Sequence, residues 1–212
     1  MEIALATTAG TVLWTGEAAT VREAVERAAA DGVSLDGVNL RGADLRGARL
    51  DGVSMAGADL SEADLTEAHL VEANLVQALL VRARLVKVRM NRAWLDSASL
   101  FGAMAAKARL IEADLTDANL GRTDLSGAAV MWADMTRAFL EEAVLDRACL
   151  KGATLRHACL RHTSLRATNF ITADLSFADL TGARAEGLKL EGATVEGITP
   201  AAGEISALAA KA

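Results

Sequence analysis

The sequence predicts an all-β solenoid, a four-sided parallel β-helix in which the chain turns a corner every five residues. Every fifth residue from Leu35 to Val195 is apolar, giving 33 consecutive units without an insertion or deletion, and 25 of them carry Leu. The residue two positions earlier is small in nearly every unit and is Ala in 25 of them. A period of five fits neither an α-helix at 3.6 nor a flat strand at 2. Four units per coil would stack residues 20 apart at roughly 4.8 Å, giving about eight coils in a rod on the order of 40 Å long.

The repeat divides the chain into three expected segments. Residues 1–32 precede it as an N-terminal cap, residues 33–197 form the β-helix, and residues 198–212 form a C-terminal tail. The first coil of a solenoid exposes unpaired backbone groups and an apolar cross-section, so a cap is expected there. In the tail, Thr199 and Pro200 can start a short helix through Glu204 to Ala210. The tail is expected either to close the far end or to contact a second copy, so the chain is a monomer or a homodimer.

The cap is expected to contain a hairpin and a helix. Partial alternation of apolar residues predicts strands at Ile3–Thr7 and Thr11–Trp14 around a turn at Thr8–Gly10. The pattern Thr20-Val21-Arg22-Glu23 is that of a capping box, which marks the start of a helix. Gly32 suits the left-handed residue that ends it. The helix has a single apolar stripe, formed by Val21, Ala24, Val25, Ala28 and Ala29.

Composition narrows the class of protein. The formal net charge of −6 disfavours direct nucleic-acid binding, which normally comes with a basic excess. No stretch approaches the roughly 20 uncharged apolar residues that a membrane-spanning helix needs. The start of the chain has neither a cationic region nor a cleavable apolar segment. These features predict a cytoplasmic protein without a membrane span.

The repeat units have a specific consensus. Units such as AGADL, SEADL, VEANL, IEADL, TDANL and SFADL resemble the pentapeptide-repeat family, whose unit is A-(D/N)-L-x-x. The resemblance covers about 165 residues and implies that the four-sided β-helix is right-handed. The family includes proteins that mimic DNA and bind a type II topoisomerase such as gyrase. The resemblance therefore implies one candidate partner.

No catalytic group of residues stands out, so neither an enzyme nor a cofactor is predicted. The Asp and Asn residues before the inward Leu are expected to bond to neighbouring backbone, which is a structural role. The stretch His157–His162 contains two His and Cys159, but three Arg crowd it and a fourth ligand is missing, so no metal site is predicted. Cys149 and Cys159 are ten residues apart, on opposite sides of a four-sided coil, which excludes a disulfide.

The outward positions suggest two kinds of surface. Folding the sequence on a 20-residue period gives two apolar patches, whose candidate partner-binding residues are Phe101, Met104, Ile111, Met131 and Trp132. Such patches favour a rigid scaffold or protein-interaction module with a protein partner that the sequence leaves unidentified. The alternative is a DNA mimic that uses one acidic side of the rod, with candidate residues Asp96, Asp114, Asp117 and Asp134. Bands of basic residues, including one around Arg89, oppose this alternative because a basic DNA groove would repel them.

Overall fold

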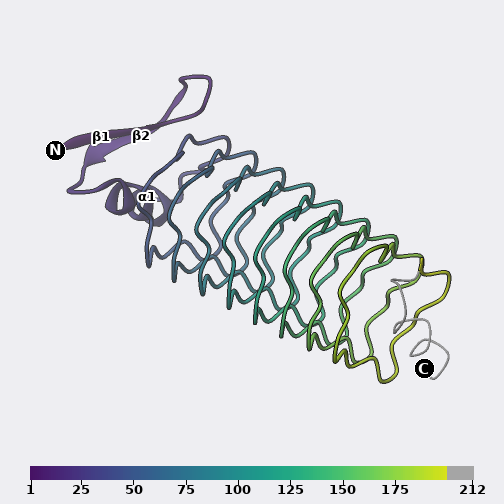
Figure 1. Cartoon of the computed structure of the whole chain (residues 1–212). Coiled ribbons are helices and arrows are strands. Elements are labelled where there is room, and N and C mark those ends of the chain that lie inside the picture. Colours follow the sequence, from purple (N-terminus) through teal and green to yellow (C-terminus); the bar gives the residue numbers. More distant parts are fainter. Residues whose placement is uncertain (200–212) are drawn as a thin grey trace.

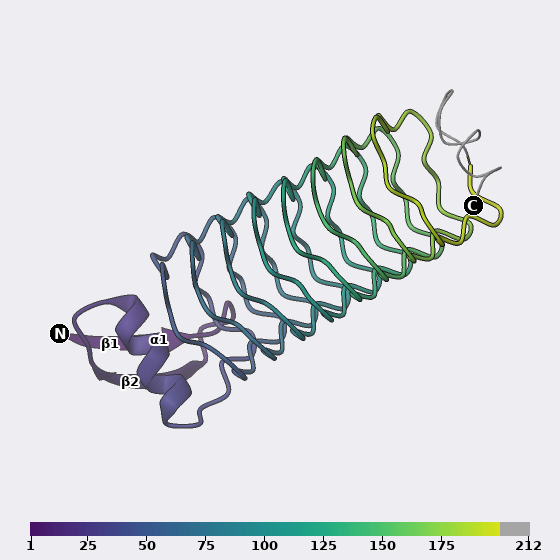
Figure 2. The same cartoon turned by 90° about the horizontal axis from the view of Figure 1, so that it is seen from below.

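The computed structural model describes residues 1–199, which form a rod of stacked coils with a cap at the N-terminal end (Figure 1). The cap contains strands β1 (Glu2–Ala6) and β2 (Val12–Glu17), followed by helix α1 (Val21–Ala30). Figure 2 shows the hairpin and α1 together at one end of the rod. The predicted tail helix from Glu204 to Ala210 lies outside the described residues.

The predicted hairpin is confirmed, although β2 runs three residues further than predicted. β1 and β2 are antiparallel, and Glu2 pairs with Glu17 while Leu5 pairs with Trp14. The longer β2 follows from this register, because its last three residues pair with the start of β1. Partial alternation in the sequence does not reveal how far a partner strand reaches.

Helix α1 begins and ends at the predicted residues. The Thr20 side chain accepts a hydrogen bond from the Glu23 amide at 3.1 Å, while the Glu23 carboxylate accepts one from the Ala19 amide at 2.7 Å. The carboxylate thus reaches one residue before the N-cap. At the other end Gly32 is left-handed (φ 73°), and the Val33 amide bonds back to the Ala28 carbonyl oxygen at 3.0 Å, as in a Schellman motif.

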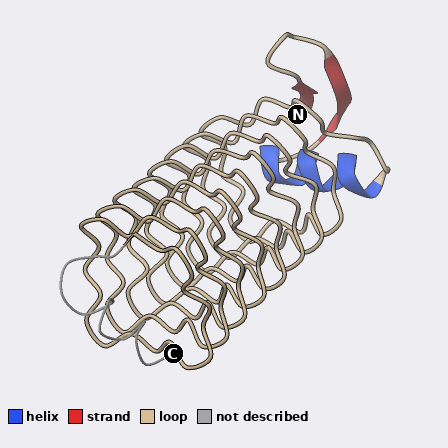
Figure 3. Cartoon of the chain, turned by 90° about the vertical axis from the view of Figure 1, so that its right-hand side faces the viewer, coloured by secondary structure: helices blue, strands red, loops and turns tan. Residues whose placement is uncertain are grey.

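One side of α1 packs on the rod. Ala24, Val25 and Ala28 are buried, but Val21, which the stripe included, is 36% exposed. It lies in the first turn beside a surface hollow, where no packed neighbour covers it. Figure 3 shows α1 crossing the end of the coils. The stripe is therefore one turn shorter than the sequence predicts.

Backbone hydrogen bonds join the cap to the first coil. The Asn39 amide donates to the Ala6 carbonyl oxygen at 2.8 Å, and the Thr8 amide donates to the Gly37 carbonyl oxygen at 3.2 Å. On the helix side, the Glu26 carboxylate accepts the Arg49 amide at 2.9 Å. The cap thus satisfies backbone groups that a first coil would otherwise leave unpaired.

The body of the rod is a right-handed, four-sided parallel β-helix, as predicted. Parallel bridges join residues 20 apart and form one column on each side of the rod. We name each column after one member: the Asp114 column (Ser54, Asn74, Trp94, Asp114, Asp134, Thr154, Asp174, Thr194), the Phe139 column (Asn39, Asp59, Leu79, Ser99, Asn119, Phe139, Cys159, Asp179, Thr199), the Asp64 column (Asp44, Asp64, Arg84, Met104, Asp124, Val144, Ser164, Arg184) and the Arg89 column (Arg49, His69, Arg89, Arg109, Ala129, Cys149, Asn169, Lys189).

The Asp or Asn of the consensus supplies an acceptor for the one amide of the unit that the backbone ladder leaves unpaired. In the unit from Asp64 to Ala68, four amides bond to backbone carbonyl oxygens at 2.8–2.9 Å, three of them on neighbouring coils. The remaining amide, on Thr66, donates to the Asp64 carboxylate at 3.0 Å. Where no Asp or Asn precedes the inward residue, the coil before can supply the acceptor, as Asp51 does for the Val71 amide at 2.8 Å. The predicted structural role of these side chains is confirmed.

The corners are tight turns with a left-handed residue. The amide of the small residue donates to the inward residue three positions back, as from Ala63 to the Leu60 carbonyl oxygen at 3.1 Å. The second corner residue has a positive φ, whether it is a glycine such as Gly57 or, at 21 described positions, another residue such as Glu62. Each non-glycine residue there is strained by about 1 kcal/mol. The 20-residue ladder of hydrogen bonds therefore imposes the corner on whatever residue occupies it.

Some of these corner glycines accommodate an aromatic ring from the coil before. A Cβ atom built on Gly152 would lie 2.6 Å from a ring carbon of Trp132, and one on Gly197 would lie 2.5 Å from a ring carbon of Phe177. At Gly127, by contrast, the nearest atom is a Lys107 side-chain carbon at 3.8 Å. A glycine at position 152 thus meets two requirements: it adopts the left-handed corner conformation, and it leaves room for the Trp132 indole.

The inward stack gives a first prediction. Leu120 is fully buried, so Leu120→Asp places an unpaired charge in an apolar interior at a cost of several kcal/mol. We expect cooperative thermal unfolding to disappear in circular dichroism. The control is Asn119→Asp, which adds the same charge at the adjacent outward position. A near-wild-type cooperative melt of Leu120→Asp would contradict the packed-coil structure.

The corner glycines give a second prediction. Gly127→Ala should cost about 1 kcal/mol of unfolding free energy, because only the positive φ opposes it. Gly152→Ala meets the same strain and also displaces Trp132, so it should cost more and shift the tryptophan emission spectrum. Chemical denaturation followed by fluorescence measures both effects. Equal losses of stability with unchanged spectra would show that Trp132 does not rest on Gly152.

Candidate interaction surface

Within residues 1–199 the rod is filled by side chains, and its larger hollows lie on the outside. The inward Leu and Ala residues are almost completely buried from Leu45 to Leu180, whereas Ala183, Ala185 and Leu188 further along are half-buried. Three buried Thr replace Ala in the stack, and each hydroxyl donates to a backbone carbonyl oxygen, as Thr123 does to Leu100 at 2.7 Å. The surface is therefore where this chain presents chemistry to other molecules.

One hollow is aromatic, and we call it the aromatic groove. It has a volume of about 330 Å³ and is lined by Phe101, Asn119, Gly121, Arg122, Phe139, Glu141 and Glu142. Gly121 follows Phe101 one coil later at the same corner position and is buried, so the missing side chain leaves room for the Phe101 ring to lie against it. A Cβ atom on Gly121 would come within 3.1 Å of the Phe101 ring.

Charged residues border the two rings of the groove. The Arg122 guanidinium lies 5.7 Å from the centroid of the Phe101 ring and also donates to the Glu142 carboxylate at 2.8 Å. The ring of Phe139 is 58% exposed. Phe101 was predicted as a partner-binding residue and Phe139 was missed. The 20-residue period places Phe139 in the coil after Asn119. The sequence therefore contained the evidence for Phe139, but only a comparison of the bridge-column positions together with the corner positions reveals it.

The other predicted apolar residues lie on different sides of the rod. Met104 is 40% exposed and belongs to the Asp64 column, around the corner from Phe101. Ile111 and Met131 are half-buried in successive coils at the corner after the Arg89 column, and Trp132 beside them is 55% exposed. The structure therefore separates the five predicted residues into the aromatic groove, one isolated Met and one corner patch.

The four predicted acidic residues do come together, around a cation. Asp114 and Asp134 are neighbours in the Asp114 column. The Asp117 carboxylate accepts a hydrogen bond from Arg137 at 2.7 Å, which lowers the pKa of Asp117. The hydrogen bond to Asp117, together with the charges of Asp117, Asp134 and Asp96, raises the pKa of Arg137. This side of the rod is acidic, but a guanidinium lies at its edge.

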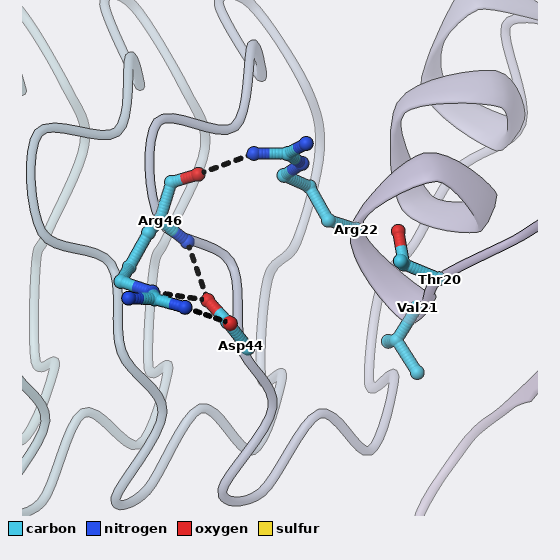
Figure 4. A pocket seen from close by; sticks show the side chains of 5 residues that line it. All are labelled: Thr20, Val21, Arg22, Asp44 and Arg46. Atoms are coloured by element: carbon cyan, nitrogen blue, oxygen red, sulfur yellow. Dashed lines mark hydrogen bonds and ion pairs between the residues drawn. The ribbon is translucent and has the colours of Figure 1, made fainter.

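A further hollow, of about 390 Å³, lies where the cap meets the rod (Figure 4). The Arg22 guanidinium donates to the Arg46 carbonyl oxygen at 2.9 Å. The Arg46 guanidinium in turn donates to both carboxylate oxygens of Asp44, at 2.8 and 2.6 Å. Hydrogen bonds from Arg46 lower the pKa of Asp44 to about 2. Because these groups satisfy one another, we assign the hollow to the attachment of the cap.

The His and Cys residues do not converge. His157 stacks on Phe177, with ring centroids 5.0 Å apart. Cys149 and Cys159 are free and belong to different bridge columns. In the part of the chain that the structure describes, no group of three or more His, Cys, Asp or Glu could hold a metal ion. None of the helices there is long and apolar enough to span a membrane.

Comparisons with known proteins agree with this architecture. A family model for pentapeptide repeats matches residues 31–66, 58–95, 95–128, 132–161 and 158–197. The crystal structure of HetL, a pentapeptide repeat protein involved in heterocyst differentiation regulation from the cyanobacterium Nostoc sp. strain PCC 7120, is 34% identical. The match covers 78% of this chain and 77% of HetL with a TM-score of 0.58.

Other solved structures are more distant. Full-length QnrB1, a plasmid-mediated fluoroquinolone resistance protein, is 18% identical over 82% of this chain and 95% of its own, with a TM-score of 0.28. Rfr23 from the cyanobacterium Cyanothece 51142 is 29% identical over 52% of this chain and 58% of its own, with a TM-score of 0.22. No curated protein sequence matches the chain. On the family model and the similarity to HetL, the chain belongs to the pentapeptide-repeat family.

Proposed function

We propose that the chain is a non-enzymatic, cytoplasmic interaction module, a rigid rod that presents a fixed surface to a protein partner. The aromatic groove carries this proposal. Two aromatic rings line this hollow, and aromatic side chains in a concave site commonly anchor protein interfaces. The similarity to HetL, a protein involved in regulation, supports a regulatory role.

The construction of the rod suits this role. On all four sides of the rod, three amides of a mid-rod unit donate to carbonyl oxygens of the adjacent coils, so outward side chains have fixed relative positions. A surface that is already ordered loses little conformational entropy on binding. Residues 33–197 act as the presenting rod in this proposal, with residues 1–32 as its cap and residues 198–212 closing or pairing the far end.

The groove proposal predicts a site-specific cross-link. A photo-reactive amino acid at Glu141, in the groove, should capture a partner in cells, whereas one at Arg147, on another corner, should not. Phe101→Ser with Phe139→Ser should reduce this adduct about tenfold, as expected for the loss of an aromatic anchor. The control is Trp94→Ser, whose side chain is 57% exposed on the neighbouring side, close to the 58% of Phe139. An adduct that survives the double substitution would overturn the groove as the binding surface.

A second candidate function is binding to a type II topoisomerase such as gyrase by imitation of DNA. Asp114 and Asp134 stack in neighbouring coils and have Asp96 and Asp117 beside them. A basic DNA-binding groove attracts such carboxylates as it attracts phosphates. Against this candidate, Arg137 already neutralises Asp117, and Trp94 precedes Asp114 in the column.

A supercoiling assay separates the two candidates. If the rod imitates DNA, micromolar protein should inhibit gyrase, and the inhibition should weaken between low and physiological salt. Asp114→Lys with Asp134→Lys should abolish it. The control is Asp59→Lys with Asp179→Lys, which makes the same charge change on the neighbouring side. Absence of inhibition at both salt concentrations would reject the DNA-mimic candidate and leave only the interaction-module proposal.

A further inference from the structure

One side of the rod carries a stack of basic residues. Arg49, His69, Arg89 and Arg109 are four successive members of the Arg89 column, joined by parallel bridges. The three Arg side chains are exposed and His69 is half-buried. We call this group the arginine ladder. The Arg89 column contains no carboxylate from Arg49 to Lys189, whereas each of the other three columns contains at least two.

The ladder arginines lack acidic partners. Among residues 1–199, no carboxylate oxygen lies within 4.0 Å of the guanidinium groups of Arg49, Arg89 or Arg109. Elsewhere, residues 20 apart do pair opposite charges, as Lys87 does with Glu67 at 2.7 Å and Arg122 with Glu142 at 2.8 Å. The geometry of the coils therefore permits ion pairs that the ladder does not use.

The carboxylates at the edges of the ladder are already engaged. Glu67 pairs with Lys87, and Arg92 lies between Glu72 at 3.5 Å and Glu112 at 2.8 Å. At the top of the ladder, the Glu26 carboxylate accepts the backbone amide of Arg49. Lys107, at the corner two residues before Arg109, adds a further cation without a carboxylate within 4.0 Å in the described chain. The ladder guanidinium groups thus face outward without a directly paired carboxylate, and the nearby carboxylates of Glu26 and Asp51 bind backbone amides.

This arrangement opposes folding. Neighbouring members are separated by about 4.8 Å, the spacing of adjacent strands, and like charges directly opposite each other destabilise a sheet. The fold does not require cations there, because the same column carries Ala129 and Asn169 further along. A local arrangement that costs stability without an internal gain is typical of a functional surface.

We propose that the arginine ladder docks an extended, acidic segment of a partner protein. Three steps of about 4.8 Å give a strip of roughly 14 Å, which matches four or five residues of extended chain. Guanidinium groups bind carboxylates through paired hydrogen bonds. The inference rests on the proposed role as an interaction module, but it uses a side of the rod other than the aromatic groove.

Charge around the ladder favours a peptide over a nucleic acid. Beside the ladder, the Asp64 column carries Asp44 and Asp64, and the Asp114 column carries Asp114 next to Arg109. A phosphate backbone broader than the strip would meet these carboxylates, and the chain has a net charge of −6. A single extended segment can contact the ladder alone.

The test is fluorescence anisotropy of a labelled octaglutamate peptide with the full chain at low ionic strength. Arg89→Glu interrupts the ladder at its centre and should weaken binding about tenfold. The same substitution should leave the midpoint of thermal unfolding unchanged or raise it, because it replaces repulsion by attraction. The matched control is Arg137→Glu, which makes the same charge change but breaks the pair with Asp117. It should lower the midpoint and change binding less than twofold.

The other outcomes overturn the inference. Equal weakening by both substitutions would indicate attraction by net charge alone, and no binding by the wild-type chain would remove the docking site. A lower unfolding midpoint for Arg89→Glu would mean that the ladder stabilises the fold. Tighter binding of an eight-nucleotide single-stranded DNA than of octaglutamate would assign the ladder to nucleic acid. Because Phe101 and Phe139 remain intact in these variants, failure here leaves the groove proposal standing, and the reverse also holds.

Discussion

The ladder of backbone hydrogen bonds between residues 20 apart is the constraint on which the structure depends. It positions each inward Leu above the Leu of the coil before, and it fixes the corner where the chain must turn. The interior can then be small and uniform, because each layer repeats the last and aromatic residues are not needed to fill it. Phe170, buried in place of a Leu, shows that a larger side chain fits near the far end of the stack.

The same constraint explains which residues are free to vary. An inward position must be apolar, and the position two before it must be small. The residue between them is favoured when its side chain can accept a hydrogen bond from a neighbouring backbone amide. The second corner position is left-handed whatever residue occupies it, so Arg, Glu and Trp are found there despite the strain. The remaining variation is outward. The outward side chains that can carry function are therefore arranged in columns along the rod, where residues 20 apart are neighbours.

Reading the surface as columns separates three environments on one rigid body. The aromatic groove combines the exposed Phe139 with the half-buried Phe101, the Asp114 column is acidic with Arg137 at its edge, and the arginine ladder is basic. Many opposite charges from successive coils pair on the surface of the rod, where each exposed pair adds little stability. The ladder differs in that its unpaired arginines lie in one column, so its charge is concentrated on one side of the rod.

The strict period of five and its small residue determined the fold from the sequence alone, because a one-residue slip would turn every Leu outward. The cap helix could also be predicted from the sequence, since Thr20, Glu23 and Gly32 act through local hydrogen bonds. What the sequence did not decide was the arrangement of side chains across coils. The end of β2 depended on the reach of β1, and the exposure of Val21 depended on how α1 meets the rod. Three further contacts likewise required the tertiary structure. The Trp132 ring lies against Gly152, Phe139 lines the same groove as Phe101, and Asp117 pairs with Arg137. Those contacts join residues about 20 or more positions apart on an outward surface, where no packing rule restricts the side chain and only the folded coil sets distance and direction.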